Sequence, residues 1–207
     1  MKLLKKFLLL FIMIICILPM VSIRVTAMSE IVLENGTKLP DYFFVGEIYD
    51  LKVSGKTVNF RSSYPEKAKI EEESGELTPL KPGSVKITAT ARSSGKVVAT
   101  KVITILERAK SISTNISDIT IFIGDAVTIK TELIPSTSTD ILRYKSDDNT
   151  IATVSLTSGV ITGIGPGTTT INVYSKATST TSNVDPDNVC SSIKVTVLDP
   201  EEDIDNP

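Results

Sequence analysis

Residues 159–171 have the sequence Gly-Val-Ile-Thr-Gly-Ile-Gly-Pro-Gly-Thr-Thr-Thr-Ile, and residues 75–87 have the sequence Gly-Glu-Leu-Thr-Pro-Leu-Lys-Pro-Gly-Ser-Val-Lys-Ile. The two stretches lie 84 residues apart and share the opening glycine, a Pro-Gly pair and the closing isoleucine. The match continues without a gap from Phe60 to Ala91, where Phe60-Arg61-Ser62-Ser63 corresponds to Tyr144-Lys145-Ser146-Asp147. An internal repeat of this kind indicates tandem units with one common fold.

The spacing between matched residues changes outside this block, and the changes locate two insertions. Phe44–Glu47 matches Phe122–Asp125 at a spacing of 78, and Ile103–Ile105 matches Val195–Val197 at a spacing of 92. These shifts place extra residues around Ile134–Thr139 and around Thr180–Asp187 in the second unit. Both segments are rich in Ser, Thr, Pro or Asp, which is typical of exposed loops. The boundary between the units falls near Glu107–Lys110, and so short a connection predicts limited hinge freedom.

The segments between the turns have the pattern of half-buried strands. Apolar residues alternate with polar ones from Val85 to Ala91, and the second unit repeats this alternation around Ile171 and Val173. A period of two places one row of side chains inward and the next outward, as in an antiparallel sheet. Each unit contains about seven such runs at intervals of roughly 8–12 residues, which predicts an all-β sandwich. The pairs Pro82-Gly83 and Pro166-Gly167 predict type II turns between strands.

The first residues have the pattern of a secretory signal peptide. Lys2, Lys5 and Lys6 precede an apolar run from Phe7 to Leu18, and Val25-Thr26-Ala27 supplies the small residues of a cleavage site. We therefore expect a helical signal peptide over residues 1–27 that is cleaved after Ala27. The alternative is an uncleaved anchor, for which the stretch from Phe7 to Ile23, broken by Pro19, is marginal in length.

The charge and the side-chain inventory exclude several classes of function. The chain has 22 basic and 24 acidic residues, and removal of a leader with four basic residues leaves a net charge of −6. That charge disfavours nucleic acid and anionic membrane surfaces as partners. The chain contains no histidine, which removes Ser-His-Asp triads and imidazole metal sites. A carboxylate pair for glycoside hydrolysis remains formally possible, but the acids lie in runs typical of solvated surface, so we predict that the protein is not an enzyme and has no cofactor.

Several residues of the second unit resemble those of a known family. The segments are Tyr144-Lys145-Ser146-Asp147, Ile151-Ala152-Thr153-Val154, Gly159–Gly163 and Gly165–Ile171, and they look like the bacterial immunoglobulin-like domain, group 2. The first unit keeps only the skeleton of that pattern. The family often has tryptophan where this chain has Phe60 and Tyr144. The resemblance implies two tandem Ig-like Greek-key sandwiches in an exported or surface protein, with no common active site.

The remaining candidate sites are few. Gly163–Gly167 is followed by a strand pattern and not by a helix, so it is a turn and not a phosphate loop. Asp185, Asp187 and Asn188 are weak candidates for calcium ligands, because hard oxygens suit Ca²⁺, although such residues are also common in turns. Cys190 is the one cysteine of the mature chain, so an intermolecular disulfide is an alternative to an incidental thiol.

The nine aromatic residues that follow the leader divide into two groups by their place in the repeat. Four of them stand at matched positions and are predicted to lie in the core: Phe44, Phe60, Phe122 and Tyr144. The other five are candidates for surface contacts with a glycan, with scattered exposure as the simpler interpretation: Tyr42, Phe43, Tyr49, Tyr64 and Tyr174.

These observations predict a signal peptide at 1–27, Ig-like domains at 28–108 and 109–199, and an acidic tail at 200–207. The protein is expected to be secreted or held at the cell surface, as a monomer that acts as a structural or adhesion-type interaction module. Its partners would be a cell-envelope protein, a host surface protein or a glycan. The alternatives are a glycan- or host-protein-binding module that uses the loops of the second domain, and an accessory subunit of an extracellular enzyme.

Overall fold

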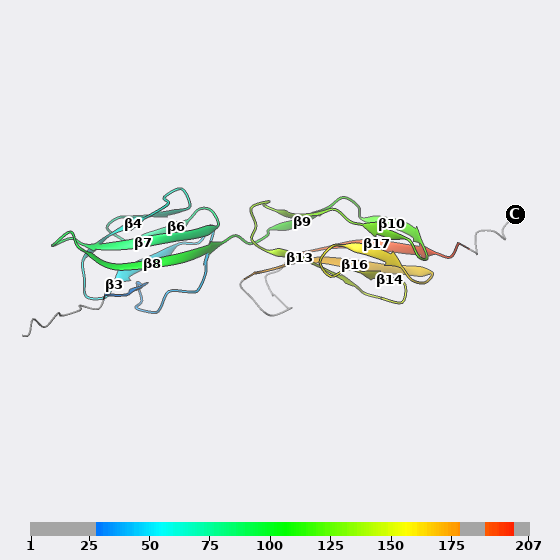
Figure 1. The fold of residues 1–207 in the computed structure, drawn as a ribbon, viewed down its shortest axis with the longest axis horizontal. Coiled ribbons are helices and arrows are strands. Elements are labelled where there is room, and N and C mark those ends of the chain that lie inside the picture. Colours follow the sequence, from blue (N-terminus) through cyan, green and yellow to red (C-terminus); the bar gives the residue numbers. More distant parts are fainter. Residues whose placement is uncertain (1–27, 179–188, 201–207) are drawn as a thin grey trace, which may run out of the picture.

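The computed structural model describes residues 28–178 and 189–200. Every regular secondary-structure element among these residues is a β-strand. The strands form two bodies that follow one another along the long axis of the molecule (Figure 1). The predicted all-β class is thereby confirmed for the described residues. The signal peptide with Ala27, the calcium candidates Asp185, Asp187 and Asn188, and most of the acidic tail lie outside them.

The first body, which we call the first sandwich, consists of two four-stranded sheets. One sheet has the order β1-β3-β6-β5, with the bounds Ile31–Leu33, Tyr49–Val53, Glu76–Pro79 and Ala68–Ile70. The other has the order β2-β8-β7-β4, with the bounds Phe43–Phe44, Val97–Leu106, Gly83–Ala91 and Val58–Ser62. All neighbours are antiparallel except β2, which runs parallel to β8. In chain order this is the A-B-E-D sheet and the C-F-G sheet of an immunoglobulin fold, with β2 added to the G strand.

The second sandwich repeats this arrangement with one strand divided. Its first sheet has the order β10-β17-β16-β13, with the bounds Asp118–Phe122, Cys190–Leu198, Gly167–Lys176 and Ile141–Ser146. The facing strands form two smaller sheets, β11-β15-β14 and β12-β9, with the bounds Ala126–Thr128, Val160–Gly163, Ala152–Val154, Thr131–Ile134 and Ser111–Thr114. Strands β11 and β12 together take the place that β3 has in the first sandwich.

The hydrogen bonds of the two sandwiches correspond at the spacings found in the sequence. The amide of Leu51 donates to the carbonyl of Gly75 at 3.0 Å, and the amide of Ile129 donates to the carbonyl of Gly159 at 3.1 Å. Phe60 is paired with Ala89 across two strands, and Tyr144 is paired with Val173 in the same way. Two Ig-like sandwiches in tandem are therefore present, as predicted.

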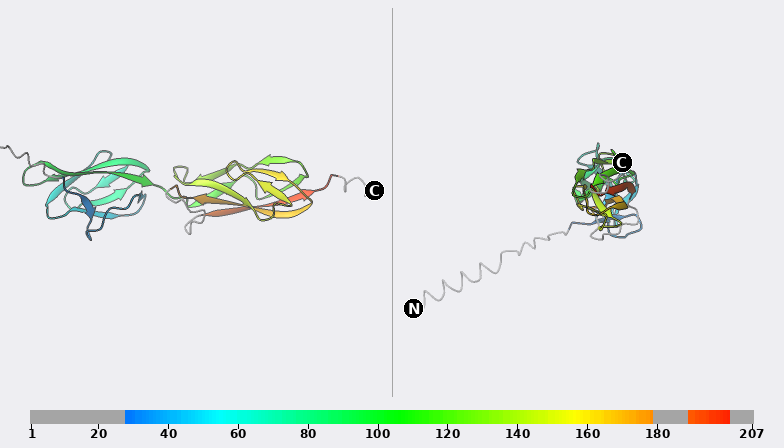
Figure 2. Two further views of the ribbon diagram at one scale, coloured as in Figure 1. Left: turned by 60° about the horizontal axis from the view of Figure 1, so that its bottom comes forward. Right: turned by 90° about the vertical axis from the view of Figure 1, so that its right-hand side faces the viewer.

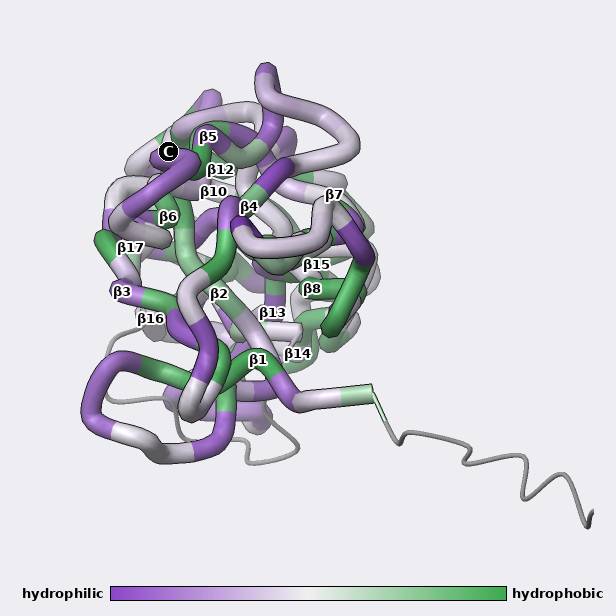
Figure 3. The backbone as a smooth tube through the Cα atoms, turned by 90° about the vertical axis from the view of Figure 1, so that its left-hand side faces the viewer, coloured by the Kyte–Doolittle hydropathy of each residue, from purple (hydrophilic) through white to green (hydrophobic). Residues whose placement is uncertain are grey.

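The sheets of each sandwich are layered on one another (Figure 2), and each sandwich has its own cluster of buried apolar residues. Hydrophobic residues are gathered along the strands, whereas the connecting loops are mostly hydrophilic (Figure 3). Fully buried members of the first core include Phe43, Leu51, Leu77, Ile87 and Ile105, and those of the second include Ile161, Ile171, Val173, Ile193 and Val195. Neither core contains a disulfide, so apolar burial and sheet hydrogen bonds stabilise the described part of the chain.

The expectation that all four repeat-matched aromatic residues lie in the core is wrong for one of them. Phe60 and Tyr144 are each 5% exposed, as predicted, and Phe44 is half-buried. Phe122 is 41% exposed, and Phe43, which was expected at the surface, is 1% exposed. The reason is strand parity: Phe43 and Ile121 supply the inward side chain of β2 and β10, so the following phenylalanine points outward.

Gly75 and Gly159 allow the buried aromatic rings to pack against the backbone. A Cβ atom on Gly75 would lie 2.8 Å from Cε2 of Phe60, and a Cβ atom on Gly159 would lie 2.9 Å from Cζ of Tyr144. Both glycines also have positive φ angles, of +79° and +67°, which other residues rarely adopt. The repeat shows that these glycines are shared, but this ring contact could not be predicted from the sequence.

The glycines of the two Pro-Gly pairs stand at the start of β7 and β16. Gly83 has a φ of +130° and Gly167 has a φ of +144°. Positive values favour glycine at both positions, while the type II assignment for Pro82-Gly83 and Pro166-Gly167 stays a prediction.

Candidate functional site

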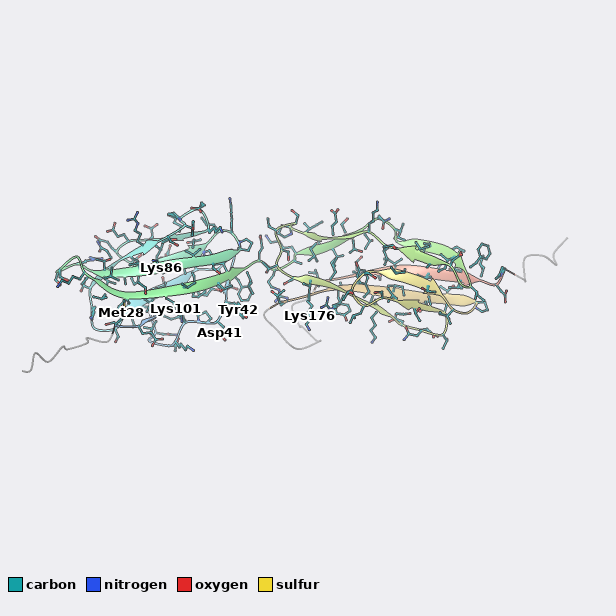
Figure 4. The ribbon with its side chains drawn as sticks, viewed as in Figure 1. Met28, Asp41, Tyr42, Lys86, Lys101 and Lys176 are labelled. Atoms are coloured by element: carbon teal, nitrogen blue, oxygen red, sulfur yellow. The ribbon has the colours of Figure 1, made fainter. Side chains whose placement is uncertain are left out.

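Several hydrogen bonds and an ion pair join the chain at the junction between the sandwiches. The connection Glu107–Lys110 leaves the end of β8 and passes directly beside Ser138–Asp140 of the second sandwich. Figure 4 shows Asp41 and Tyr42 at the end of the first sandwich that faces the junction, and Lys176 at the near end of the second. We call the contact of Glu107–Lys110 with Ser138–Asp140 the junction clamp.

Hydrogen bonds in both directions attach Glu107 to the second sandwich. Its amide donates to Oγ1 of Thr139 at 3.0 Å, and its carbonyl accepts from the amide of Thr139 at 2.8 Å. The same carbonyl also accepts from Oγ1 of Thr139 at 3.0 Å and from Oγ of Ser138 at 3.1 Å. The next residues are attached as well, because the amide of Lys110 donates to the carbonyl of Ile134 at 2.7 Å.

Asp140 is the charged centre of the clamp. Its side chain is 1% exposed, and its Oδ2 atom accepts from the amide of Ala109 at 3.0 Å and from Nε of Arg108 at 3.2 Å. The guanidinium of Arg108 thus neutralises a carboxylate that burial would otherwise make costly. A hydrogen bond with a charged partner is worth about 1.5–3 kcal/mol, roughly twice a neutral one, which makes Asp140 the residue on which the clamp depends most.

The clamp leaves little free chain between the two sandwiches. The carbonyl of Leu106 accepts from the amide of Val45 within the first sandwich, and the amide of the next residue, Glu107, already bonds to the second. These two groups belong to the same peptide unit, which is planar and does not rotate about its C–N bond. The chain is therefore attached to both sandwiches at one rigid unit, which is far less freedom than a flexible linker of several residues supplies.

The clamp refines one expectation from the sequence. The insertion around Ile134–Thr139 was predicted to be an exposed loop, and Ile134, Ser136 and Thr137 are exposed, whereas Ser138 and Thr139 are half-buried and the adjoining Asp140 is buried. The physical reason is that the hydroxyl groups of Ser138 and Thr139 bond to the connection between the units. The sequence located this insertion just before β13. Its composition could not show that the insertion contacts Glu107.

A second polar feature is a groove of about 820 Å³ on the first sandwich, beside the free edge of β4. Its lining includes Asn59 and Arg61 of β4, Glu72 of the loop after β5, and the outward threonines of β7. The side-chain amide of Asn59 donates to Oε1 of Glu72 at 2.6 Å, and the groove is open to solvent. Equivalent positions of the second sandwich hold Arg143, Lys145 and Leu156, so the groove is not a repeated feature.

Two ionisable groups outside the junction have displaced pKa values. Burial, together with a hydrogen bond to Glu47, raises the pKa of Tyr49 to about 12. Hydrogen bonds from the side chain and the amide of Thr150 lower the pKa of Asp148 below its ordinary value. Tyr49 begins β3 and Asp148 lies in the turn after β13, and the partners named here lie within two residues of each group, so the displaced pKa values reflect local structure.

The remaining candidates of the sequence are dispersed. Cys190 is an exposed free thiol at the start of β17. Among the described residues no group of three or more histidines, cysteines and carboxylates is placed to hold a metal ion. Tyr42 and Tyr64 are exposed at 37% and 52%, but they lie in separate loops of the first sandwich, and Lys67 stands over the Tyr64 ring. No helix in the described part of the chain is long and apolar enough to cross a membrane.

Residues 108–184 match the family of the bacterial Ig-like domain, group 2. This match covers β9 to β16 of the second sandwich and ends before β17, and it does not extend over the first sandwich. A search of curated proteins gives no match.

Among solved structures, the chain is similar to surface layer protein SbsC, domains 1–6, with 18% identity and a TM-score of 0.36, over 82% of this chain and 27% of that one. It is also similar to a C-terminal intimin fragment solved in complex with the intimin-binding domain of the translocated intimin receptor, with 16% identity and a TM-score of 0.46. That likeness covers 83% of this chain and 64% of the fragment. Mouse cadherin-23 EC22–24 is similar at 9% identity, with a TM-score of 0.39, over 83% of this chain and 67% of that one. The chain therefore spans about a quarter of the surface layer protein it resembles.

Proposed function

We propose that this protein is a non-enzymatic, exported Ig-like module whose two domains form a stiff spacer at the cell surface or in the secreted state. The proposed domains are residues 28–108 and 109–199, behind a signal peptide cleaved after Ala27, and both are proposed to be copies of the group 2 bacterial Ig-like domain. Support for the second copy comes from the match over residues 108–184, and support for the first comes from its corresponding strand order.

The observation that carries the proposal is the junction clamp. A spacer must hold its two ends at a fixed distance and orientation. A hinge of several freely rotating residues would let the orientation of one sandwich vary relative to the other. Here one peptide unit carries both the attachment of the chain to the first sandwich and its attachment to the second. Asp140 and Thr139, which make the second attachment, belong to or adjoin the insertion that distinguishes the second unit from the first.

The test measures the distribution of distances between the two sandwiches. Spin labels are placed at Lys86→Cys and Lys145→Cys, both at exposed positions, in a Cys190→Ser background, and pulsed dipolar spectroscopy records the distances. We expect one narrow distribution, which Asp140→Ala broadens. The control is Asp147→Ala, which removes an exposed carboxylate of the second sandwich away from the clamp and should leave the distribution narrow. A broad distribution in the chain without Asp140→Ala would contradict the spacer function.

Export and ligand binding are tested separately. Fractionation of the producing cells followed by N-terminal sequencing should find the chain outside the cytoplasm with Met28 as its first residue. A glycan array and a panel of host matrix proteins should give no saturable binding. Saturable binding of a glycan that is lost when the loop around Thr180–Asp187 is replaced would favour a ligand-binding module instead.

A further inference from the structure

The outward face of one sheet of the first sandwich is positively charged. This sheet, β2-β8-β7-β4, contains the basic residues Arg61, Lys86 and Lys101 and no acidic residue. Arg61 and Lys86 are exposed and alternate with buried residues along β4 and β7, so both side chains point away from the core. In the part of the chain that the structure describes, neither of them has an ion-pair partner.

The negative charge of the chain does not extend to this sandwich. Residues 28–106 contain 11 basic and 10 acidic residues, whereas residues 107–207 contain 7 basic and 14 acidic residues. The excess of acids that disfavours anionic partners therefore lies in the second part of the chain. Exposed charges interact over only about 8 Å at physiological salt, so the sign of a local face decides which ligand can approach it.

The two cations stand at the groove beside β4. Arg61 lines the groove, and Lys86 adjoins it, because the amide of Lys86 donates to Oγ of the lining residue Ser63 at 3.1 Å. Arg61 is paired with Thr88, and Lys86 precedes Thr88 by two residues on the same strand, so the three side chains share one face. Diagonal neighbours of this kind are about 7–8 Å apart, which lets two long cationic side chains contact successive anionic groups of one linear ligand.

The remaining polar lining is suited to hydroxyl groups. Thr88 and Thr90 supply hydroxyl groups from β7, and Asn59 and Glu72 supply an amide and a carboxylate that are joined by the hydrogen bond of 2.6 Å. Together these groups can both donate hydrogen bonds and accept them, as a ligand with several hydroxyl groups requires.

The groove offers no aromatic platform on which a sugar or a nucleic-acid base could stack. Phe60, the aromatic residue of the lining, is 5% exposed. Tyr64 lies in the adjoining loop, and the Nζ atom of Lys67 stands over its ring at 5.4 Å from the centroid. The chemistry of the groove therefore favours a flexible chain of anionic and hydroxylated units over a glycan or a single-stranded nucleic acid.

We propose that this groove binds a polyol phosphate, a linear polymer in which phosphodiester groups alternate with hydroxylated carbon units and which needs no sugar ring. Its phosphates pair with Arg61 and Lys86, and the hydroxyl groups between them bond to Thr88 and Glu72. A polymer of this chemistry in the cell envelope would retain the spacer at the surface. That consequence rests on the proposed export, whereas the binding itself is measured on the purified chain.

The site is expected once in each chain. At the repeat spacing, Lys86 corresponds to Thr170 and Glu72 corresponds to Leu156, so the second sandwich lacks one of the two cations and the carboxylate. Only the cation of β4 is repeated, as Lys145 of β13.

The experiment is a fluorescence anisotropy titration of a labelled glycerol phosphate oligomer with the full chain, purified after export, at about 50 mM and about 200 mM salt. We expect saturable binding that weakens as the salt rises, because each phosphate contact releases a counterion. Arg61→Ala and Lys86→Ala should each weaken binding about two- to fivefold, as expected for an exposed ion pair. Each should also reduce the slope of log K against log salt by about 0.7.

Two lysines provide matched controls. Lys101 is an exposed cation of the same sheet (Figure 4), but it is paired with Ile87, whose side chain is buried, so it does not share the face of Lys86. Lys145 occupies the corresponding position of the second sandwich. Lys101→Ala and Lys145→Ala should leave the affinity unchanged, and Thr88→Val should weaken binding without changing the salt slope, because it removes a hydroxyl group and no charge.

Two competitors distinguish the source of the phosphate and the need for hydroxyl groups. Polyglutamate of equal charge should compete at least about tenfold more weakly than the unlabelled oligomer, and vesicles that contain phosphatidylglycerol should not bind the chain. The proposal is overturned by the absence of saturable binding up to about 1 mM oligomer, by equal competition from polyglutamate, or by binding to the vesicles alone. An equal loss in Lys101→Ala and Arg61→Ala chains with unchanged circular dichroism overturns it as well. Distances across the junction, measured as described above, are independent of these outcomes.

Discussion

Replacing Gly75 by alanine tests whether the close approach of the Phe60 ring to the backbone stabilises the first sandwich. The new Cβ atom would lie 2.2 Å from the carbonyl oxygen of Leu51 and 2.8 Å from Cε2 of Phe60. Neither neighbour can move freely, because Leu51 belongs to β3 and donates its amide to Gly75, and Phe60 is 5% exposed. The φ of +79° adds a second cost, since a left-handed conformation disfavours any residue with a Cβ atom.

The magnitude follows from these two contributions and from a matched control. A left-handed φ costs about 1–2 kcal/mol for alanine, and overpacking a filled core costs about 1–3 kcal/mol. Gly75→Ala should therefore reduce the free energy of unfolding by about 2–5 kcal/mol. Gly55 has a φ of +67°, and a Cβ atom added there would meet nothing within 4 Å, so Gly55→Ala should show only the conformational part.

Urea unfolding followed by far-ultraviolet circular dichroism gives the two free energies, and hydrogen exchange at Leu51 assigns the transition to the first sandwich. Two sandwiches can unfold separately, so the transition that moves must be identified before a free energy is assigned. If Gly55→Ala and Gly75→Ala cost the same within about 0.5 kcal/mol, a difference too small for a core clash, then ring packing at Gly75 contributes nothing and the argument fails.

Three further outcomes are expected. The pKa of the Tyr49 phenol is about 12 in the folded chain and about 10, its ordinary value, in the unfolded chain. The free energy of unfolding should therefore fall as the pH rises from about 10 to about 12. Tyr49→Phe should remove that part of the decline in urea titrations at alkaline pH. The lowered pKa of Asp148 contributes stability that is present above the unfolded value and is lost as the pH falls through the folded one, and Asp148→Asn should flatten that acid limb. Asp140→Ala should lower the free energy of unfolding of the second sandwich by about 2–3 kcal/mol, because the Ala109 amide and the Arg108 guanidinium lose their contacts with the Asp140 carboxylate. The control Asp147→Ala should lower it by less than about 0.5 kcal/mol.

The sequence predicted the sandwiches well because their determinants are local. Strand alternation and Pro-Gly turns depend on neighbouring residues, and the 84-residue repeat set the alignment of Phe60 with Tyr144, both of which are buried. Phe122 was assigned wrongly because its place was taken from the repeat match to Phe44, whereas within its own strand β10 the inward side chain is that of Ile121.

The junction was predictable only in part, for a different physical reason. The short connection at Glu107–Lys110 indicated limited freedom, and the insertion at Ile134–Thr139 was located correctly. Their contact joins residues more than 30 positions apart, and polar residues in a loop have the same composition whether they bond to water or to another segment. Burial of Asp140 therefore appears only once the two segments are placed in space.

A comparison of the two sandwiches within one chain indicates where function is located. Positions without room for a different side chain are the same in both copies: Ala68 and Ala152 are each fully buried, and Gly75 and Gly159 each support an aromatic ring. The outward rows differ, with Lys69 of β5 replaced by Thr153 of β14 and Thr90 of β7 replaced by Tyr174 of β16. A ligand bound on the sheet faces would need those rows to be alike if both copies served it. Among the described residues, the distinctive polar contacts lie instead at the junction, which is where the proposed spacer would need them.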